Sequence, residues 1–206
     1  MTLATPLPNA LVHVVDDDPA IRDSLSFLLG SRGLRTREWA SGEAFLAGGP
    51  SGLACVVLDM RMDGISGLEV LERMHALGRS EPVVFLTGHA DVPIAVEALK
   101  KGAFDFVEKP FNDNALVDTV LAALARAEAD RSAHEGRDLV ESRLSGLTSR
   151  EREVLDLLLD GRLNKQIADD LKVSMRTVEV HRARIFEKMG VRNAVELATL
   201  LTAGRR

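Results

Sequence analysis

Carboxylates, a hydroxyl and an ammonium follow directly behind short apolar runs in the first half of this chain. If these runs are parallel strands, their carboxyl ends meet at one edge of a sheet and bring the polar groups together. In chain order the groups are Asp16, Asp17 and Asp18 after the first run, Asp59 after the third, Thr87 after the fourth and Lys109 after the fifth.

This combination of groups suits phosphoryl chemistry. Carboxylates gathered at one edge repel one another and therefore require a cation. Mg²⁺ prefers oxygen ligands and keeps waters that a phosphate can replace. An aspartate beside Mg²⁺, a hydroxyl and a lysine can attack a phosphoryl group, because the two cations neutralise charge on its oxygens. One carboxylate at a strand end is usually a loop cap, but four groups in register favour a phosphoryl pocket.

The segments that position this pocket alternate between two periodicities. Short valine-rich runs are typical of strands buried in a parallel sheet, and the segments between them repeat apolar residues at helical spacing. The expected strands are Leu11–Val15, a weaker one near Leu34–Trp39, Cys55–Leu58, Val83–Leu86 and Phe104–Val107, and the expected helices are Pro19–Leu29, Ser41–Leu46, Gly67–Ala76, Pro93–Lys101 and Asn112–Ala125. This alternation predicts an α/β doubly wound domain with a five-stranded parallel sheet over residues 1–125.

Residues 144–206 show helical patterns only. A capping box from Thr148 to Glu151 opens an apolar-periodic helix, and three further helices are expected at Asn164–Leu171, at Met175–Met189 and from Asn193 to Leu201. A tight turn before the third helix is typical of a helix-turn-helix domain. Residues 126–143 between the two domains predict a helical linker with a solvated charged face, and a coiled-coil seam is the alternative.

Charge differs between the two ends of the chain, whose net charge is −5. Residues 1–125 hold 10 Lys and Arg against 17 Asp and Glu, whereas residues 147–206 hold 12 against 9. The basic tail therefore indicates a polyanionic partner. A hydrophobic content of 46% with 28% charged residues excludes a disordered chain, a collagen and a disulfide scaffold. With one cysteine, no signal-peptide pattern and no membrane-length apolar run, we expect a cytoplasmic protein with no membrane partner.

Several stretches of the sequence resemble known domains. VHVVDDDPAIRDSL, VVLDMRM, FLTGHAD and FDFVEKPF resemble the receiver domain (a flavodoxin-like fold) of two-component response regulators. LTSREREVLDLLLDGRLNKQIADDLKVSMRTVEVHRARIFEKMGV resembles a helix-turn-helix of the LuxR/NarL type. In combination they resemble the FixJ branch of the response regulators.

This resemblance implies a role for each pocket residue. It implies that Asp59 is the phosphoacceptor and that Thr87 and Lys109 contact the phosphoryl group. Thr87 and Phe106 would form the switch pair. The Mg²⁺ ligands would be Asp17, Asp59 and the backbone carbonyl of Arg61, with Asp16 holding a ligand water.

One position departs from the family pattern. Met62 is followed by Asp63, where the family usually has proline. This change frees the backbone φ angle and adds a carboxylate near the pocket mouth, so it bears on loop rigidity, Mg²⁺ affinity and acyl-phosphate lifetime. The resemblance also implies a cis peptide bond between Lys109 and Pro110.

The third helix of the tail is the expected DNA reader. Val178, Ile185 and Met189 share its inward face, which leaves a basic and polar face for the major groove. By resemblance, Glu179, Val180 and Arg182 are the base-contact candidates and Lys165, Thr177 and Lys188 the phosphate-contact candidates, with Arg176 and Arg184 adding positive charge.

These features predict a DNA-binding transcription regulator rather than an enzyme. It would accept a phosphoryl group from a sensor histidine kinase, bind double-stranded promoter DNA and work with RNA polymerase, and the resemblance favours activation. The phosphorylated form is expected to be a homodimer that uses Val92, Val96, Leu99 and Lys100.

Two alternatives remain open. One is a Mg²⁺-dependent phosphohydrolase of the haloacid-dehalogenase type that uses Asp59 as nucleophile. It lacks the usual acid two residues later, where Arg61 stands, and Asp63 is four residues away. The other is a regulator whose receiver is a phosphorylation-independent dimerisation module.

Overall fold

The computed structural model describes residues 10–48, 52–88 and 92–203. The chain forms two compact units, Met1–Arg131 and Ser132–Arg206. Within the described residues, no helix is both long and apolar enough to cross a membrane.

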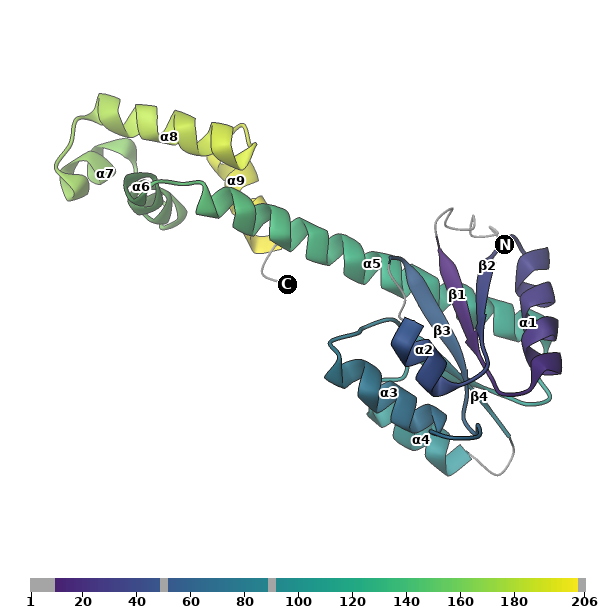
Figure 1. Ribbon diagram of the computed structural model, residues 1–206. Coiled ribbons are helices and arrows are strands. Elements are labelled where there is room, and N and C mark those ends of the chain that lie inside the picture. Colours follow the sequence, from purple (N-terminus) through teal and green to yellow (C-terminus); the bar gives the residue numbers. More distant parts are fainter. Residues whose placement is uncertain (1–9, 49–51, 89–91, 204–206) are drawn as a thin grey trace. The chain divides into compact units, whose positions relative to one another are not determined.

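The first unit is built on a five-stranded parallel sheet (Figure 1). The strand order is β2-β1-β3-β4-β5, and all neighbours pair in parallel. The strands are β1 Leu11–Val15, β2 Arg35–Trp39, β3 Ala54–Asp59, β4 Val83–Thr87 and β5 Asp105–Glu108. The predicted doubly wound fold is therefore confirmed.

Helices cover both faces of this sheet. One core contains Leu25 and Leu29 of α1 with Leu116 and Val120 of α5, and the other contains side chains of α2, α3 and α4. The helices of this unit are α1 Pro19–Ser31, α2 Gly42–Gly48, α3 Gly67–Ala76, α4 Val92–Lys100 and the first part of α5 Asp113–Ser145. Every residue of β3 is buried, because its side chains alternate between the two cores.

Helix α5 runs 33 residues from one unit into the other. Its first turns are buried in the sheet core. Residues 129–139 are exposed to solvent, and the next residue, Val140, is buried. Ion pairs one turn apart support this stretch, such as Arg126–Asp130 at 2.7 Å. This part of the helix is therefore solvated, and even its apolar residue Leu139 is half exposed.

The second unit contains only helices among its described residues. They are the end of α5, α6 Ser149–Leu159, α7 Asn164–Leu171, α8 Met175–Met189 and α9 Ala194–Ala203. Thr148 and Glu151 form the predicted capping box of α6. Val154, Ile167, Val178 and others make a core separate from those of the first unit.

Candidate functional site

The carboxyl ends of β1, β3 and β5 bring the predicted pocket residues together. Asp16 follows β1, and Asp59 ends β3. Both are almost fully buried. Lys109 follows β5, and its backbone N–H donates to the carbonyl of Thr87 on β4. Parallel pairing of β1 with β3 and of β3 with β4 therefore aligns residues that are far apart in the sequence.

The Lys109 ammonium bridges two of the carboxylates. Its Nζ donates to Asp59 Oδ1 at 2.6 Å and to Asp16 Oδ2 at 3.1 Å. The other oxygen of Asp59, Oδ2, accepts a hydrogen bond from the backbone N–H of Arg61 at 3.0 Å. The Asp59 carboxylate is therefore fixed at the bottom of the pocket by both of its oxygens.

Burial and charge shift the pKa values of this pair. Desolvation raises the pKa of Asp59 above its ordinary value, the charge of Asp16 adds to this, and Lys109 opposes it. Burial also works against the Lys109 ammonium, but the hydrogen bonds and charges of Asp59 and Asp16 prevail and raise its pKa. Lys109 thus stays a cation beside Asp59.

Three carboxylates make a donor set that fits Mg²⁺. Asp16, Asp17 and Asp59 each offer an oxygen, and these oxygens lie within 4.8 Å of one another. Oxygen-only ligands suit a hard divalent cation, and one lysine does not balance three negative charges. The residues present therefore fit the metal that the sequence predicted.

Arg22 of α1 and the loop after β3 hold this donor set in place. After β1, the Arg22 guanidinium donates to the carbonyls of Asp16 (2.7 Å) and Asp17 (3.0 Å). After β3, the N–H of Asp63 donates to Asp17 Oδ2 at 2.8 Å. A side chain at Gly67 would meet the carbonyl of Asp59 at 2.3 Å, so glycine is needed for α3 to begin this close to the pocket. The Arg22 anchor and the Asp63 bond were not predicted from the sequence.

The predicted switch residues lie on β4 and β5. Thr87 is buried, and its hydroxyl donates to the carbonyl of Gly88 at 2.9 Å. Phe106 pairs in register with Phe85 and packs half-buried against the core on the α4 side. The Lys109–Pro110 peptide bond is cis, as the resemblance implies.

On α4, the predicted dimerisation residues Val96 and Leu99 are 42% and 37% exposed, large fractions for apolar side chains. Lys100 is exposed beside them. The side chain of Val92 lies outside the described part of the chain.

Helix α8 carries most of the predicted DNA-contact residues. Val178, Ile185 and Met189 are buried, as its spacing predicted. The opposite side is polar and open to solvent, and Arg176, Glu179, Val180 and Arg184 are exposed on it, as is Lys165 on α7. Thr177 is half-buried, and its hydroxyl lies 2.8 Å from that of Ser174 at the start of the helix.

Arg182 is held in place by two neighbours. Its Nη1 donates to Asn164 Oδ1 at the start of α7, at 2.5 Å, and its guanidinium lies 5.6 Å from the centre of the Phe186 ring. The sequence did not indicate this contact of Asn164, because an asparagine at a helix start is ordinarily a cap.

Lys188 is engaged within its own unit. Its ammonium donates to Glu151 Oε2 at 2.7 Å and to the carbonyl of Gly146 at 3.1 Å. Glu151 is 2% exposed, and its hydrogen bonds with Lys188 and Thr148 lower its pKa from 4.5 to about 2. Lys188 therefore ties α8 to the start of α6, a role that the sequence did not reveal.

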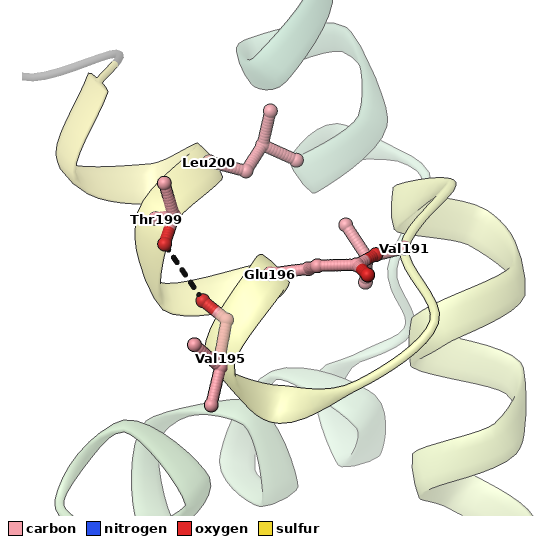
Figure 2. Close-up of a pocket in the computed structure, with 5 residues that line it drawn as sticks. All are labelled: Val191, Val195, Glu196, Thr199 and Leu200. Atoms are coloured by element: carbon pink, nitrogen blue, oxygen red, sulfur yellow. Dashed lines mark hydrogen bonds between the residues drawn. The ribbon is translucent and has the colours of Figure 1, made fainter.

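A shallow apolar hollow lies beside α9 (Figure 2). It has a volume of about 410 Å³ and is lined by Val191, Val195, Glu196, Thr199 and Leu200. The Thr199 hydroxyl donates to the Val195 carbonyl of its own helix at 2.9 Å, so it offers little to a ligand. None of the predicted site residues lines this hollow.

Comparison with known protein families finds one match in each unit. Residues 12–121 match the family described as response regulator receiver domain, and residues 145–201 match the family described as bacterial regulatory proteins, luxR family.

Several relatives match this chain over nearly their whole length. The chain is 52% identical to the C4-dicarboxylate transport transcriptional regulatory protein DctR of Rhodobacter capsulatus, over 92% of this chain and 98% of that protein. It is 49% identical to the transcriptional regulatory protein FixJ of Azorhizobium caulinodans, over 96% and 95%. Among solved structures, the response regulator StyR matches with a TM-score of 0.87 at 40% identity, over 94% of this chain and 98% of that one.

Proposed function

Because this chain belongs to the two-component response regulators that join a receiver domain to a LuxR-type DNA-binding domain, we propose that phosphorylation of Asp59 controls DNA binding by α8. The observation that carries this proposal is the Lys109 ammonium, which lies between Asp59 and Asp16 at 2.6 Å and 3.1 Å. An ammonium in this position can neutralise a phosphoryl oxygen as it arrives.

The proposed phosphoryl donor is a phosphohistidine of a sensor histidine kinase. A carboxylate oxygen of Asp59 attacks phosphorus, the phosphorus–nitrogen bond breaks, and the imidazole leaves with the electron pair. Asp59 then carries an acyl phosphate. Asp17, Asp59 and the Arg61 carbonyl would hold Mg²⁺, with Asp16 on a ligand water, and the bound cation would supply further neutralisation of charge on the phosphoryl oxygens.

The proposed switch begins at Thr87. A phosphoryl group adds negative charge and strong acceptor oxygens, so the Thr87 hydroxyl exchanges the Gly88 carbonyl for a phosphoryl oxygen. The loop between Gly88 and Val92 would follow this movement, although residues 89–91 lie outside the described residues. Phe106 then turns inward and changes the surface beside α4.

The proposed partner of the second unit is double-stranded promoter DNA. Glu179, Val180 and Arg182 are the proposed base contacts, and Lys165, Thr177 and Lys188 are the proposed phosphate contacts. Arg176 and Arg184 add positive charge to the same helix. A DNA target also supports a cytoplasmic location and cooperation with RNA polymerase, and the resemblance to the FixJ branch favours activation.

The proposed active form is a homodimer through α4, whose Val96 and Leu99 are large exposed apolar side chains. Glu97 is held by Lys101, with 2.9 Å between Oε1 and Nζ, so the face has a charged rim. A two-fold pair would present two α8 helices to two half-sites of DNA.

Sedimentation of the protein with the phosphoryl mimic beryllofluoride and Mg²⁺ tests this dimer. The parent chain should dimerise under these conditions, whereas Val96→Asp should remain monomeric.

The function is tested by loading the full chain with an acyl-phosphate donor and Mg²⁺. Intact-mass measurement should show one added phosphoryl group, and selection of bound DNA from a random pool should return an operator only for the loaded protein. Asp59→Asn should gain no mass and should not respond to the donor. Full labelling of Asp59→Asn would remove Asp59 as the acceptor. Equal DNA selection with and without the donor would favour the phosphorylation-independent alternative.

A further inference from the structure

Asp63 supplies the pocket with a group that the usual residue of its family cannot supply. Its backbone N–H donates to Asp17 Oδ2 at 2.8 Å. Proline has no backbone N–H, so this hydrogen bond exists only because position 63 is not proline. It joins the loop after β3 directly to the loop after β1.

Asp17 differs from the other two carboxylates of the cluster in its burial and in its hydrogen-bond partner. Asp16 and Asp59 are buried and held by Lys109. Asp17 is partly open to solvent, and in the described part of the chain its carboxylate accepts its hydrogen bond from Asp63. That bond fixes the Asp17 carboxylate by one of its two oxygens.

The Asp63 amide itself is held on both sides. Before it, the N–H of Arg61 donates to Asp59 at 3.0 Å. After it, the N–H of Ile65 donates to Glu43 Oε1 at 3.2 Å, following a left-handed turn at Gly64 with φ of 85°. Three alternate amides of one loop thus bind three carboxylates, and the middle amide points at Asp17 from a fixed backbone.

We propose that the Asp63 amide is a positioning group that orients Asp17 for the divalent cation. It engages one carboxylate oxygen and leaves the other for the metal. Outer partners of metal ligands ordinarily contribute about 10- to 100-fold to affinity. This inference rests on the proposed Mg²⁺ site and adds a backbone group that strengthens it.

Substitutions at position 63 separate the amide from the side chain, which is exposed. Asp63→Ala removes the carboxylate and keeps the N–H, whereas Asp63→Pro removes both. In calorimetric Mg²⁺ titration of the full chain, Asp63→Ala should stay within about twofold of the parent. Asp63→Pro should bind on the order of tenfold more weakly. Equal affinities for the two variants, whether strong or weak, would overturn the positioning role. A parent chain that binds no Mg²⁺ would instead overturn the metal site on which the inference rests.

A second measurement needs neither proline nor metal. In metal-free protein, hydrogen exchange of the Asp63 amide should be slow and should accelerate by about tenfold or more in Asp17→Ala, which removes the acceptor. The Ile65 amide, bonded to Glu43, is the internal control and should keep its rate. An Asp63 amide whose exchange is unchanged by Asp17→Ala would overturn the inference even if Asp63→Pro failed to fold.

Discussion

His13 is a fully buried imidazole in β1, and the indole N–H of Trp39 donates to its Nδ1 at 2.9 Å. Its Nε2 has no hydrogen-bond partner among the described residues. Burial, with the charges of Arg37 and Arg79, lowers the pKa of His13 from 6.5 to about 4. The folded chain therefore keeps this imidazole neutral at pH values where the unfolded chain protonates it.

This difference predicts acid sensitivity of the first unit. Between pH 6.5 and about 4 the unfolded state binds more protons, so stability falls as the pH falls through this window. The pKa difference corresponds to a loss on the order of 3 kcal/mol. Urea unfolding followed by fluorescence of Trp39, the sole tryptophan, measures it. His13→Gln should show a shallower pH dependence, whereas His134→Gln, exposed on α5, should match the parent. An identical pH dependence for His13→Gln and the parent would contradict the assignment.

Lys188 makes a structural contact with Glu151 and is also a proposed phosphate contact, and comparison with Lys165 separates the two roles. Its ion pair with the buried Glu151 predicts that Lys188→Ala leaves a buried carboxylate without its charge partner, which destabilises the second unit. The Glu151 contribution is present above pH 4.5 and is lost as the pH falls toward about 2. Lys188→Ala should therefore lower both thermal stability and DNA affinity. Lys165→Ala should lower only DNA affinity, with a salt slope smaller by about one. Unchanged melting of Lys188→Ala would show that the pair is not structural.

At the scale of elements, α8 carries the proposed base contacts, and each of these depends on a single side chain. Arg182 is fixed by Asn164, so little conformational entropy remains to be lost when its guanidinium contacts a base edge. Arg182→Ala should weaken binding to the selected operator by roughly 1–3 kcal/mol and relax specificity at one position. Arg184→Ala should weaken all sequences to a similar extent. Competition binding with operator and random DNA measures both, and a uniform loss for Arg182→Ala would make it a phosphate contact.

Elements of this chain were predictable where local pattern and tertiary packing agree. The helices Gly67–Ala76, Asn164–Leu171 and Met175–Met189 have the predicted bounds, because caps such as Ser66 and Ser174 fix their starts. The weak second strand was also found, as the mostly exposed edge strand β2. The last strand begins one residue later than predicted, at Asp105.

The residues of the pocket could be predicted from their positions at the ends of parallel strands, whereas the groups that hold those residues in place could not. Parallel pairing is enough to bring Asp16, Asp59 and Lys109 to one edge. The amide of Asp63 and the pairing of Lys188 with Glu151 depend on loop and helix positions in three dimensions. The sequence shows that position 63 is not proline and so has a backbone N–H, but not which acceptor that N–H meets. A lysine on a helix is ordinarily solvated, so the pairing of Lys188 leaves no sequence signal.

At the scale of the whole molecule, the chain has separate cores in its two units. The sheet is packed on both faces by its own helices, and the helices of the second unit enclose a third cluster. Between them, residues 129–139 of α5 are exposed to solvent. A helix without buried apolar contacts transmits little cooperativity, because most helix stability in proteins comes from packing.

The two units should therefore unfold in two transitions. Trp39 reports only the first unit, whereas far-UV circular dichroism reports the helices of both, so the two probes should give different urea midpoints. Ile185→Ala, in the core of the second unit, should cost about 2–5 kcal/mol there and shift the dichroism curve while leaving the Trp39 midpoint in place. Val57→Ala in β3 should shift the Trp39 midpoint. Coincident curves for both probes in the parent and both variants would mean that α5 couples the units into one cooperative body. The switch would then act through a rigid helix rather than through a solvated connection between independently folded units.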